Sequence, residues 1–304
     1  MKKSSVFIKG VNEGYLNVLS FLPSTKPKAI LHISHGMGEH AQRYTDFATF
    51  LTEHGIAVYA HDHRAHGKSL RPNQDVGMFR KDDSFDAIVQ DVDVVIKHIK
   101  GVHKDVPINL LGHSMGSIIL RRYLQLYHGD IEKAVIMGTL PKYSTGYTKM
   151  MRLAAFLMTL FKSNTVRAEN VAKLMNDGLI KDLPHQTKFD WITKDTAIVN
   201  KYNDDPLCGY AYNKRFYKDF FKTIEVTNKT ASIKATDQVP LLFIAGKEDP
   251  VGNHFKGVET VFNIYQELLP EHVISLVGID DARHEVLNEL NKEKTYQLLL
   301  DWLQ

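Results

Sequence analysis

Short apolar runs alternate with segments of helical periodicity along most of the 304-residue chain, and no other feature constrains its fold as strongly. Strands that alternate with helices predict a mostly parallel sheet with helices on both of its faces. The predicted strands cover residues 5–9, 15–22, 29–33, 56–60, 107–111, 133–138, 239–245 and 272–277. The predicted helices cover residues 43–53, 84–100, 115–128, 255–269 and 285–302.

The alternation stops at Pro141 and resumes at about residue 237. Between these points the sequence shows helical segments and no clear buried strand. We therefore expect one α/β core formed by residues 1–140 and 237–304, into which residues 141–236 are inserted as a mostly helical unit. A chain of this length can bury the core of one large domain without disulfides.

Charge and composition exclude several classes of protein. The net charge of +3 gives no electrostatic reason to expect a nucleic-acid partner. Cys208 is the only cysteine, which excludes an intramolecular disulfide and fits a reducing compartment. The N-terminus lacks the apolar region of a secretory signal, and the longest apolar stretch, residues 150–161, is too short to cross a bilayer. We expect a soluble, cytoplasmic protein.

Ser114 lies between two glycines in Gly112-His113-Ser114-Met115-Gly116, where a predicted strand must become a helix. A serine on such a tight turn has its hydroxyl exposed above the sheet, and small residues on either side relieve the crowding. The pattern alone is short enough to occur by chance, but the strand before it and the helix after it favour a nucleophilic serine over an ordinary glycine-flanked turn.

A serine hydroxyl needs a base, and the base needs a group that orients it. In a fold of this kind the acid and then the histidine follow the serine along the chain, in loops after later strands. Asp249 is our choice for the acid, with Glu248 as its rival and a turn or helix N-cap as the structural alternative. His284 precedes the last predicted helix and is our choice for the base, the alternative being a surface histidine or one at the N-terminus of that helix.

The negative oxygen that forms during acyl transfer needs hydrogen-bond donors. We expect one from the backbone N–H of Met115, the residue after the serine, and one from that of Met37 in the loop after the strand at 29–33. Histidines are abundant nearby (His35, His40, His61, His63 and His66). A metal cluster is the alternative interpretation, but the histidines show no metal-binding spacing, so we expect no metal.

These motifs resemble the monoacylglycerol lipase and lysophospholipase branch of the α/β-hydrolase fold. The resemblance rests on HGMGEHAQRY (35–44), HDHRAHGKS (61–69), GHSMGS (112–117), NDDPLCG (203–209), GKEDPV (246–251) and ARHEVLNE (282–289). It implies the same roles for Ser114, Asp249, His284, Met37 and Met115, and a helical cap over an acyl pocket at residues 141–236. The family usually has glycine where Ala65 stands and often glycine where Ser117 stands.

The inserted segment gives the hints about substrate. Residues 150–161, which include Phe156, form an apolar stretch with two interpretations. One is a lid helix that contacts acyl chains or a membrane surface, and the other is a helix that packs on the core. Phe216 and Phe220 belong to a second apolar group that either lines the acyl pocket or holds the cap together. Cys208 could line the site by analogy, although a lone cysteine is more often a small buried apolar residue.

Taken together, the sequence predicts a cofactor-independent serine hydrolase that cleaves a monoacylglycerol, a lysophospholipid or a related small acyl ester through an acyl-enzyme on Ser114. A peptidase or amidase of the same fold is the alternative among enzymes. A binding protein that kept the fold without the chemistry is the alternative outside them. Ser114 itself disfavours the relatives of this fold that use a carboxylate nucleophile.

Overall fold

The computed structural model of the protein describes residues 1–142, 153, 157, 160 and 163–304. Eight strands form one sheet in the order β1-β2-β4-β3-β5-β6-β7-β8. β1 and β2 pair with each other antiparallel, β2 pairs antiparallel with β4, and the strands from β4 to β8 run parallel. The strands are β1 Lys2–Lys9, β2 Tyr15–Leu22, β3 Ala29–Ser34, β4 Ile56–His61, β5 Ile108–His113, β6 Ala134–Met137, β7 Leu241–Gly246 and β8 Ile274–Ile279.

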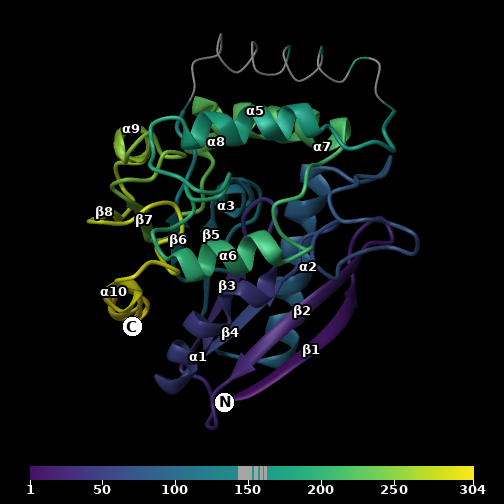
Figure 1. The fold of residues 1–304 in the computed structure, drawn as a ribbon. Helices are drawn as coiled ribbons and strands as arrows, with labels where there is room; N and C mark the ends of the chain where they lie inside the picture. Colours follow the sequence, from purple (N-terminus) through teal and green to yellow (C-terminus); the bar gives the residue numbers. More distant parts are fainter. Residues whose placement is uncertain (143–152, 154–156, 158–159, 161–162) are drawn as a thin grey trace.

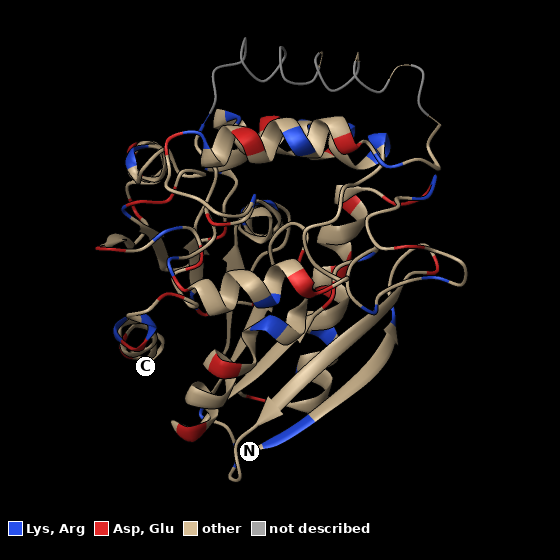
Figure 2. Cartoon of the chain, viewed as in Figure 1, with Lys and Arg blue, Asp and Glu red and all other residues tan. Residues whose placement is uncertain are grey.

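The composition of each strand fits its place in the sheet. Every residue of the central strands β4, β5, β6 and β7 is buried, as expected for parallel strands that are covered on both faces. The edge strand β1 is exposed along almost its whole length and carries three lysines. Such charges discourage pairing with another chain. In Figure 2, which colours the chain by residue type, charged residues lie mainly on helices and loops, while most of the sheet is uncharged.

Helices cover both faces of the sheet (Figure 1). Apolar side chains of α2, α3 and α9 pack in the core on one face, and those of α1 and α10 pack in the core on the other. These helices are α1 Thr45–Glu53, which follows the short 3-10 helix η1 Ala41–Tyr44, then α2 Phe85–Val102, α3 Met115–Leu126, α9 Lys256–Leu268 and α10 Lys292–Leu303. The predicted fold class, a mostly parallel sheet with helices on both faces, is confirmed.

Four further described helices lie between β6 and β7 in the sequence. They are α5 Glu169–Ile180, α6 Thr196–Asp204, α7 Lys214–Thr227 and α8 Thr230–Lys234. In Figure 1, α5, α7 and α8 lie beyond the end of the sheet where β5 gives way to α3. None of the described helices combines the length and the hydropathy needed to cross a membrane.

The last predicted helix is wrong at its start. We expected it to begin at residue 285, but α10 begins at Lys292, and residues 285–291 form turns. The carboxylate of Glu289 accepts hydrogen bonds from the backbone N–H of Arg283 at 2.6 Å and of Lys194 at 3.0 Å. The contact with Arg283 within the loop and the contact with the distant Lys194 hold residues 283–289 as a loop, and local periodicity does not report them.

Candidate active site

Ser114 connects β5 to α3 in a backbone conformation that few residues other than glycine adopt, with φ 53° and ψ −118°. A Cβ on Gly112 would lie 2.4 Å from the carbonyl oxygen of Gly116, and one on Gly116 would lie 2.0 Å from that of Ser34. Only glycine fits at either position. The sequence Gly-x-Ser-x-Gly therefore allows the tight turn that brings Ser114 to the cavity described below.

Asp249 and His284 follow β7 and β8, and the fold brings them together. Nδ1 of His284 lies 2.9 Å from Oδ2 of Asp249, and both side chains are buried. Because a carboxylate only accepts, Nδ1 carries the proton and Nε2 is left as a base. Nε2 makes no hydrogen bond within the described part of the chain. Glu248, the rival for Asp249, instead pairs with Lys194 at 2.7 Å.

Asp249 is not a helix cap, since α9 begins seven residues later at Lys256. Its second oxygen accepts the backbone N–H of Val251 at 2.8 Å, which fixes the carboxylate toward His284. A Cβ on Gly138 would lie 3.1 Å from Cε1 of His284, so the imidazole fits closely against this glycine.

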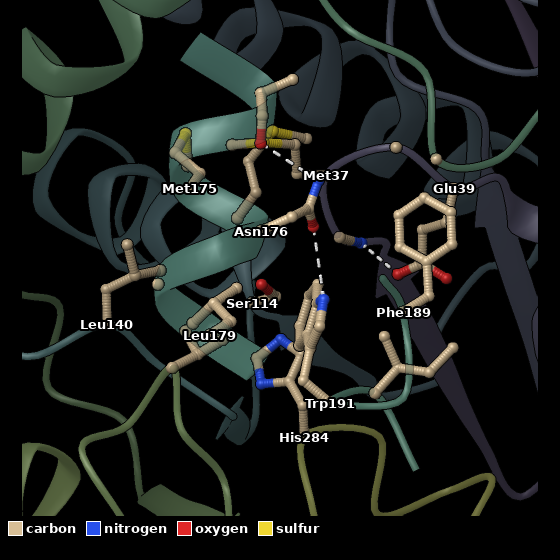
Figure 3. Close-up of a pocket in the computed structure, with 18 of the residues that line it drawn as sticks. Met37, Glu39, Ser114, Leu140, Met175, Asn176, Leu179, Phe189, Trp191 and His284 are labelled. Carbon is tan, nitrogen blue, oxygen red and sulfur yellow. Dashed lines mark hydrogen bonds between the residues drawn. The ribbon is translucent and has the colours of Figure 1, made fainter. Parts of the chain in front are cut away.

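Two aromatic rings flank the imidazole of His284. The ring of His113 lies 4.7 Å away and that of Trp191 lies 5.2 Å away, between centroids. Nε1 of Trp191 donates to Oδ1 of Asn176 on α5 at 3.3 Å (Figure 3). The segment between β6 and β7 thus contacts the imidazole directly.

A group of charged side chains lies next to His284. We call its members, Glu39, Arg43, His113 and Glu285, the charged cluster. Arg43 contacts Glu285 through two hydrogen bonds, at 2.6 and 2.7 Å, and Glu39 at 2.7 Å. Burial alone would raise the pKa of Glu39, but His113 and Arg43 hold it well below its ordinary value. Burial alone would lower the pKa of His113, but its hydrogen bond to Glu39, at 3.2 Å, and the charge of Glu39 raise it.

A second buried group, which we call the histidine cluster, lies under the loop that follows β3. Its members are His32, His35, His61, His63 and His66. Burial lowers the pKa of all five, to about 3 for His32 and His66. Neutral rings then hydrogen-bond to one another and to nearby hydroxyl and backbone groups, such as His32 to His61 at 2.9 Å and His63 to Ser34 at 3.0 Å.

The described residues include one group with metal-ligand geometry, and no member of the histidine cluster belongs to it. Possible ligand atoms of His40, Asp205 and Cys208 lie within 4.8 Å of one another. Asp205 already binds Nε2 of His40 at 2.9 Å, and burial raises the pKa of the Cys208 thiol. A protonated thiol is a poor metal ligand, so we assign no metal there.

A cavity of about 510 Å³ opens onto Ser114 and His284. Most of its wall is apolar and includes Leu140, Met175, Leu179 and Trp191 (Figure 3). Met37 and Met115, the expected oxyanion donors, line the same cavity. Met115 is the first residue of α3, so its N–H belongs to the helix turn that lacks partners within the helix.

The predicted pocket residues fare differently. Phe220 lines the cavity. Phe216 does not line it, which corrects its placement among the pocket residues and fits the other interpretation, a packing role: it is fully buried in the core and stacks on Tyr212, with ring centroids 3.6 Å apart. Cys208 is a buried member of a small apolar cluster and does not line the cavity. Phe156 lies outside the described residues.

Sequence reasoning missed the charged cluster, Trp191 and Tyr212. Glu39 and Arg43 stand within the motif HGMGEHAQRY, so their place next to Met37 was a usable signal. Trp191 and Tyr212 offer no such signal, because only the folded chain brings them to the site.

This fold and this arrangement of serine, histidine and aspartate define a serine hydrolase of the α/β-hydrolase type. The model of the family described as "Serine aminopeptidase, S33" matches residues 25–291, and the chain belongs to this family. Among its relatives is a monoglyceride lipase of Homo sapiens, 38% identical over 238 residues, which cover 77% of this chain and 70% of that protein. A "monoglyceride lipase homolog" of Monkeypox virus is 29% identical over 80% of this chain and 79% of that protein.

A solved structure supports the same fold. The carboxyl esterase of Bacillus coagulans superposes with a TM-score of 0.88 at 24% identity, covering 100% of this chain and 98% of that one. The family and its relatives establish the protein as an ester-hydrolysing serine hydrolase, as the sequence predicted.

Proposed function

We propose that this enzyme hydrolyses monoacylglycerols and related small lipid esters, with Ser114 as its nucleophile. The single observation that carries the proposal is the apolar cavity of about 510 Å³ that opens onto Ser114 and His284. Its volume falls within the usual range of small-ligand sites, and its apolar wall suits an acyl chain. Relatives named monoglyceride lipases support the same substrate class.

In this mechanism the hydroxyl of Ser114 attacks the ester carbonyl while Nε2 of His284 takes up its proton. Asp249, hydrogen-bonded to Nδ1, holds the ring in the required tautomer and stabilises the imidazolium that forms. His284 then protonates the leaving alcohol. In the second half, His284 activates water to hydrolyse the acyl-enzyme, which returns Ser114 to its starting state.

The negative oxygen of each tetrahedral intermediate would accept hydrogen bonds from the backbone N–H groups of Met37 and Met115. Loss of one such donor typically costs about 100- to 1000-fold in rate. The start of α3 adds a favourable partial positive charge near Met115.

The family description raises the alternative of an aminopeptidase, and the cavity disfavours it. An aminopeptidase must bind the positive amino group of its substrate, for which a buried carboxylate is the usual partner. The carboxylates among the described lining residues are Glu39 and Glu285, and both are already paired with Arg43. Neither is available to a second cation.

We also propose that residues 141–236 act as a cap over a core of residues 1–140 and 237–304. Residues on α5 and α7 supply much of the cavity wall, including Met175, Leu179 and Phe220. Leu153, Leu157 and Leu160 of this segment are exposed and are spaced by four and three residues. An apolar row of this kind favours contact with a lipid surface from which a monoacylglycerol is drawn.

The test is hydrolysis of p-nitrophenyl esters from acetyl to palmitoyl and of a monoacylglycerol, with alanyl- and prolyl-p-nitroanilide as amide substrates. We expect the highest kcat/KM on medium or long acyl esters and a loss of about 10⁴-fold or more in Ser114→Ala. Ser163→Ala, an exposed serine of the cap, is the control and should keep full activity. Preference for the anilides, or ester hydrolysis that survives in Ser114→Ala, contradicts the proposal.

A second experiment tests the cavity as the acyl site. Leu179→Trp should fill the part of the cavity beside α5 and move the preferred ester to a shorter chain. Lys173→Trp is the matched control, because its side chain is 75% exposed on the same helix and should leave the preference unchanged. An unchanged preference in Leu179→Trp would place the acyl chain elsewhere.

A further inference from the structure

We infer that Tyr212, a cap residue, is a positioning residue for the oxyanion site, because it fixes the backbone of the loop that carries the Met37 N–H. We call residues 35–39 the oxyanion loop. The inference rests on the proposed function, in which Met37 is an oxyanion donor. It adds that the cap completes the catalytic geometry as well as the acyl pocket.

The peptide before Met37 is held from the core. Nε2 of His35 accepts the backbone N–H of His63 at 3.0 Å, so the proton of this neutral ring is on Nδ1. Nδ1 then donates to the carbonyl oxygen of Gly36 at 2.8 Å. In a planar trans peptide the N–H points opposite to the C=O. Fixing the Gly36 carbonyl against His35 therefore fixes the direction of the Met37 N–H on the other side.

The peptide after Met37 is held from the cap. The N–H of Gly38 donates to the hydroxyl oxygen of Tyr212 at 2.5 Å. The carbonyl oxygen of Gly38, which belongs to the next peptide, accepts the hydroxyl of Tyr202 at 2.7 Å and the N–H of Gly209 at 2.9 Å. All three partners belong to the segment between β6 and β7. Met37 therefore lies between two peptides whose orientations are both fixed.

The proton positions around Tyr212 leave one arrangement. Nδ1 of His66 lies 3.0 Å from the carbonyl oxygen of Arg64, which can only accept, so Nδ1 carries the proton. Nε2 of His66 then accepts the Tyr212 hydroxyl at 2.8 Å. Burial lowers the pKa of His66 to about 3, which keeps this ring neutral. The Tyr212 hydroxyl therefore donates its hydrogen bond to His66, and its oxygen accepts the hydrogen bond from the Gly38 N–H.

Neither end of this chain of hydrogen bonds can shift easily. Tyr212 is 1% exposed, and its ring stacks on Phe216 at 3.6 Å. Gly38 has φ +64°, and a Cβ there would lie 3.3 Å from the Tyr202 hydroxyl oxygen. Because the ring of Tyr212 is packed in this way, we expect it to stay in place in Tyr212→Phe, which removes only the hydroxyl.

The experiment compares Tyr212→Phe with the wild type on p-nitrophenyl acetate, whose acyl group is too small to use the cavity wall. With the Gly38 N–H released, the Met37 donor is less well aimed, and we expect kcat to fall about tenfold, part of the loss for a missing donor. We expect KM to change less than twofold. The Ki of an alkyl trifluoromethyl ketone, which forms a tetrahedral adduct with the serine, should rise about tenfold as well.

Tyr296→Phe is the matched control. Tyr296 lies on α10, and its buried hydroxyl donates to the backbone carbonyl oxygen of Leu287 at 3.0 Å, so the variant removes one buried hydrogen bond of the same kind. Its kcat and Ki should stay within twofold of the wild type, even if its melting temperature falls. If Tyr212→Phe keeps full kcat and Ki, or loses no more than this control, the inference is wrong.

A second pair of variants covers the case in which Tyr212→Phe does not fold. His66→Gln keeps an acceptor for the Tyr212 hydroxyl and should keep most of kcat, whereas His66→Leu removes the acceptor and should lower kcat about threefold or more. Equal activity of the two variants would contradict the inference. Absence of any Ser114-dependent ester hydrolysis in the wild type would instead overturn the proposed function, so the two failures are distinguishable.

Discussion

The charged cluster and the histidine cluster are both buried beside the oxyanion loop, yet their histidines have opposite properties. His113 lies 3.2 Å from the Glu39 carboxylate, and its pKa is raised. The five rings of the histidine cluster are shielded from water as well, and their pKa values are lowered. Burial penalises the positive charge in both places, and a carboxylate at hydrogen-bond distance decides which histidine keeps it.

The comparison teaches how one buried region can serve two purposes. The histidine cluster holds backbone in place with neutral donors and acceptors, as His35 does at Gly36. The charged cluster fixes residues on both sides of the imidazole of His284, through His113 and through Glu285, whose N–H donates to the carbonyl of Ile192 at 2.7 Å. The predictions below test this division, from the largest effect to the smallest.

The histidine cluster should make the protein sensitive to acid. A ring that stays neutral when folded gains its proton only on unfolding, so below pH 6.5 each such ring lowers the free energy of unfolding by about 1.4 kcal/mol per pH unit until its folded pKa is reached. Between pH 7 and 5.5 the five rings together should remove up to about 6 kcal/mol. Urea unfolding at both pH values measures this.

The charged cluster has a different pH dependence. The raised pKa of His113 contributes stability that is complete below 6.5 and is lost as the pH rises through the folded value. The depressed pKa of Glu39 contributes stability that is complete above 4.5 and is lost below it as the pH falls through the folded value. Neither His113 nor Glu39 offsets more than a small part of the unfolding free energy that the histidine cluster removes near pH 5.5. Equal stability at pH 7 and 5.5 would show that the rings of the histidine cluster are not both neutral and buried.

Arg43→Met should be the most damaging single change within the charged cluster. It leaves the Glu39 and Glu285 carboxylates buried without their cation, and breaking a buried pair in this way typically costs about 3–5 kcal/mol. Chemical denaturation at pH 7 measures the loss. Lys173→Met, which breaks the exposed pair with Asp177, is the control and should have no measurable effect. A loss as small as that of the control would mean that the cluster is not a buried ionic network.

Glu39→Gln should make His113 resemble the rings of the histidine cluster. Without the carboxylate, burial dominates and the pKa of His113 should fall, so the midpoint of its NMR titration should move to lower pH than in the wild type. The hydrogen bonds from Gly36 and Tyr44 become weaker, which should cost about 1–3 kcal/mol of stability. An unchanged titration midpoint of His113 in this variant would show that Glu39 is not what raises its pKa.

Ala65→Gly should have the smallest effect. Ala65 lies in the loop that carries His63 and His66, is fully buried and has φ +62°, where the related family usually has glycine. Glycine relieves about 1–2 kcal/mol of left-handed strain, but it removes a buried methyl group worth about 0.8 kcal/mol and adds freedom to the unfolded chain. We expect a change in unfolding free energy below about 1 kcal/mol. A loss of several kcal/mol would mean that the methyl group is essential to the packing of this loop.

The sequence predicted those features that depend on chain order and strand ends. Ser114, Asp249 and His284 each follow a strand of the parallel part of the sheet, namely β5, β7 and β8, and parallel strands bring such loops to one edge of the sheet. Their catalytic roles remain predictions until the variants are measured. The fold class could be predicted for the same reason, since its signals repeat locally along the chain.

Features that depend on packing between distant segments could not be predicted in this way. Phe216 and Phe220 lie one turn apart on the same side of α7, so periodicity alone does not tell which of them reaches the cavity, and only Phe220 does. Tyr212 lies 174 residues from its partner Gly38, and only the folded cap brings them into contact. The start of α10 was missed because Glu289 is held by residues of the cap and of its own loop.

The most direct test of the central claim, that Ser114 is the nucleophile activated by His284 and Asp249, is covalent labelling with an alkyl fluorophosphonate followed by peptide mass mapping. We predict one added phosphonyl group, on the peptide that contains Ser114, and labelling at least about 100-fold slower in His284→Ala, since the serine then lacks its base. Rapid labelling of another residue, or labelling of Ser114 at the same rate in His284→Ala, would contradict this account.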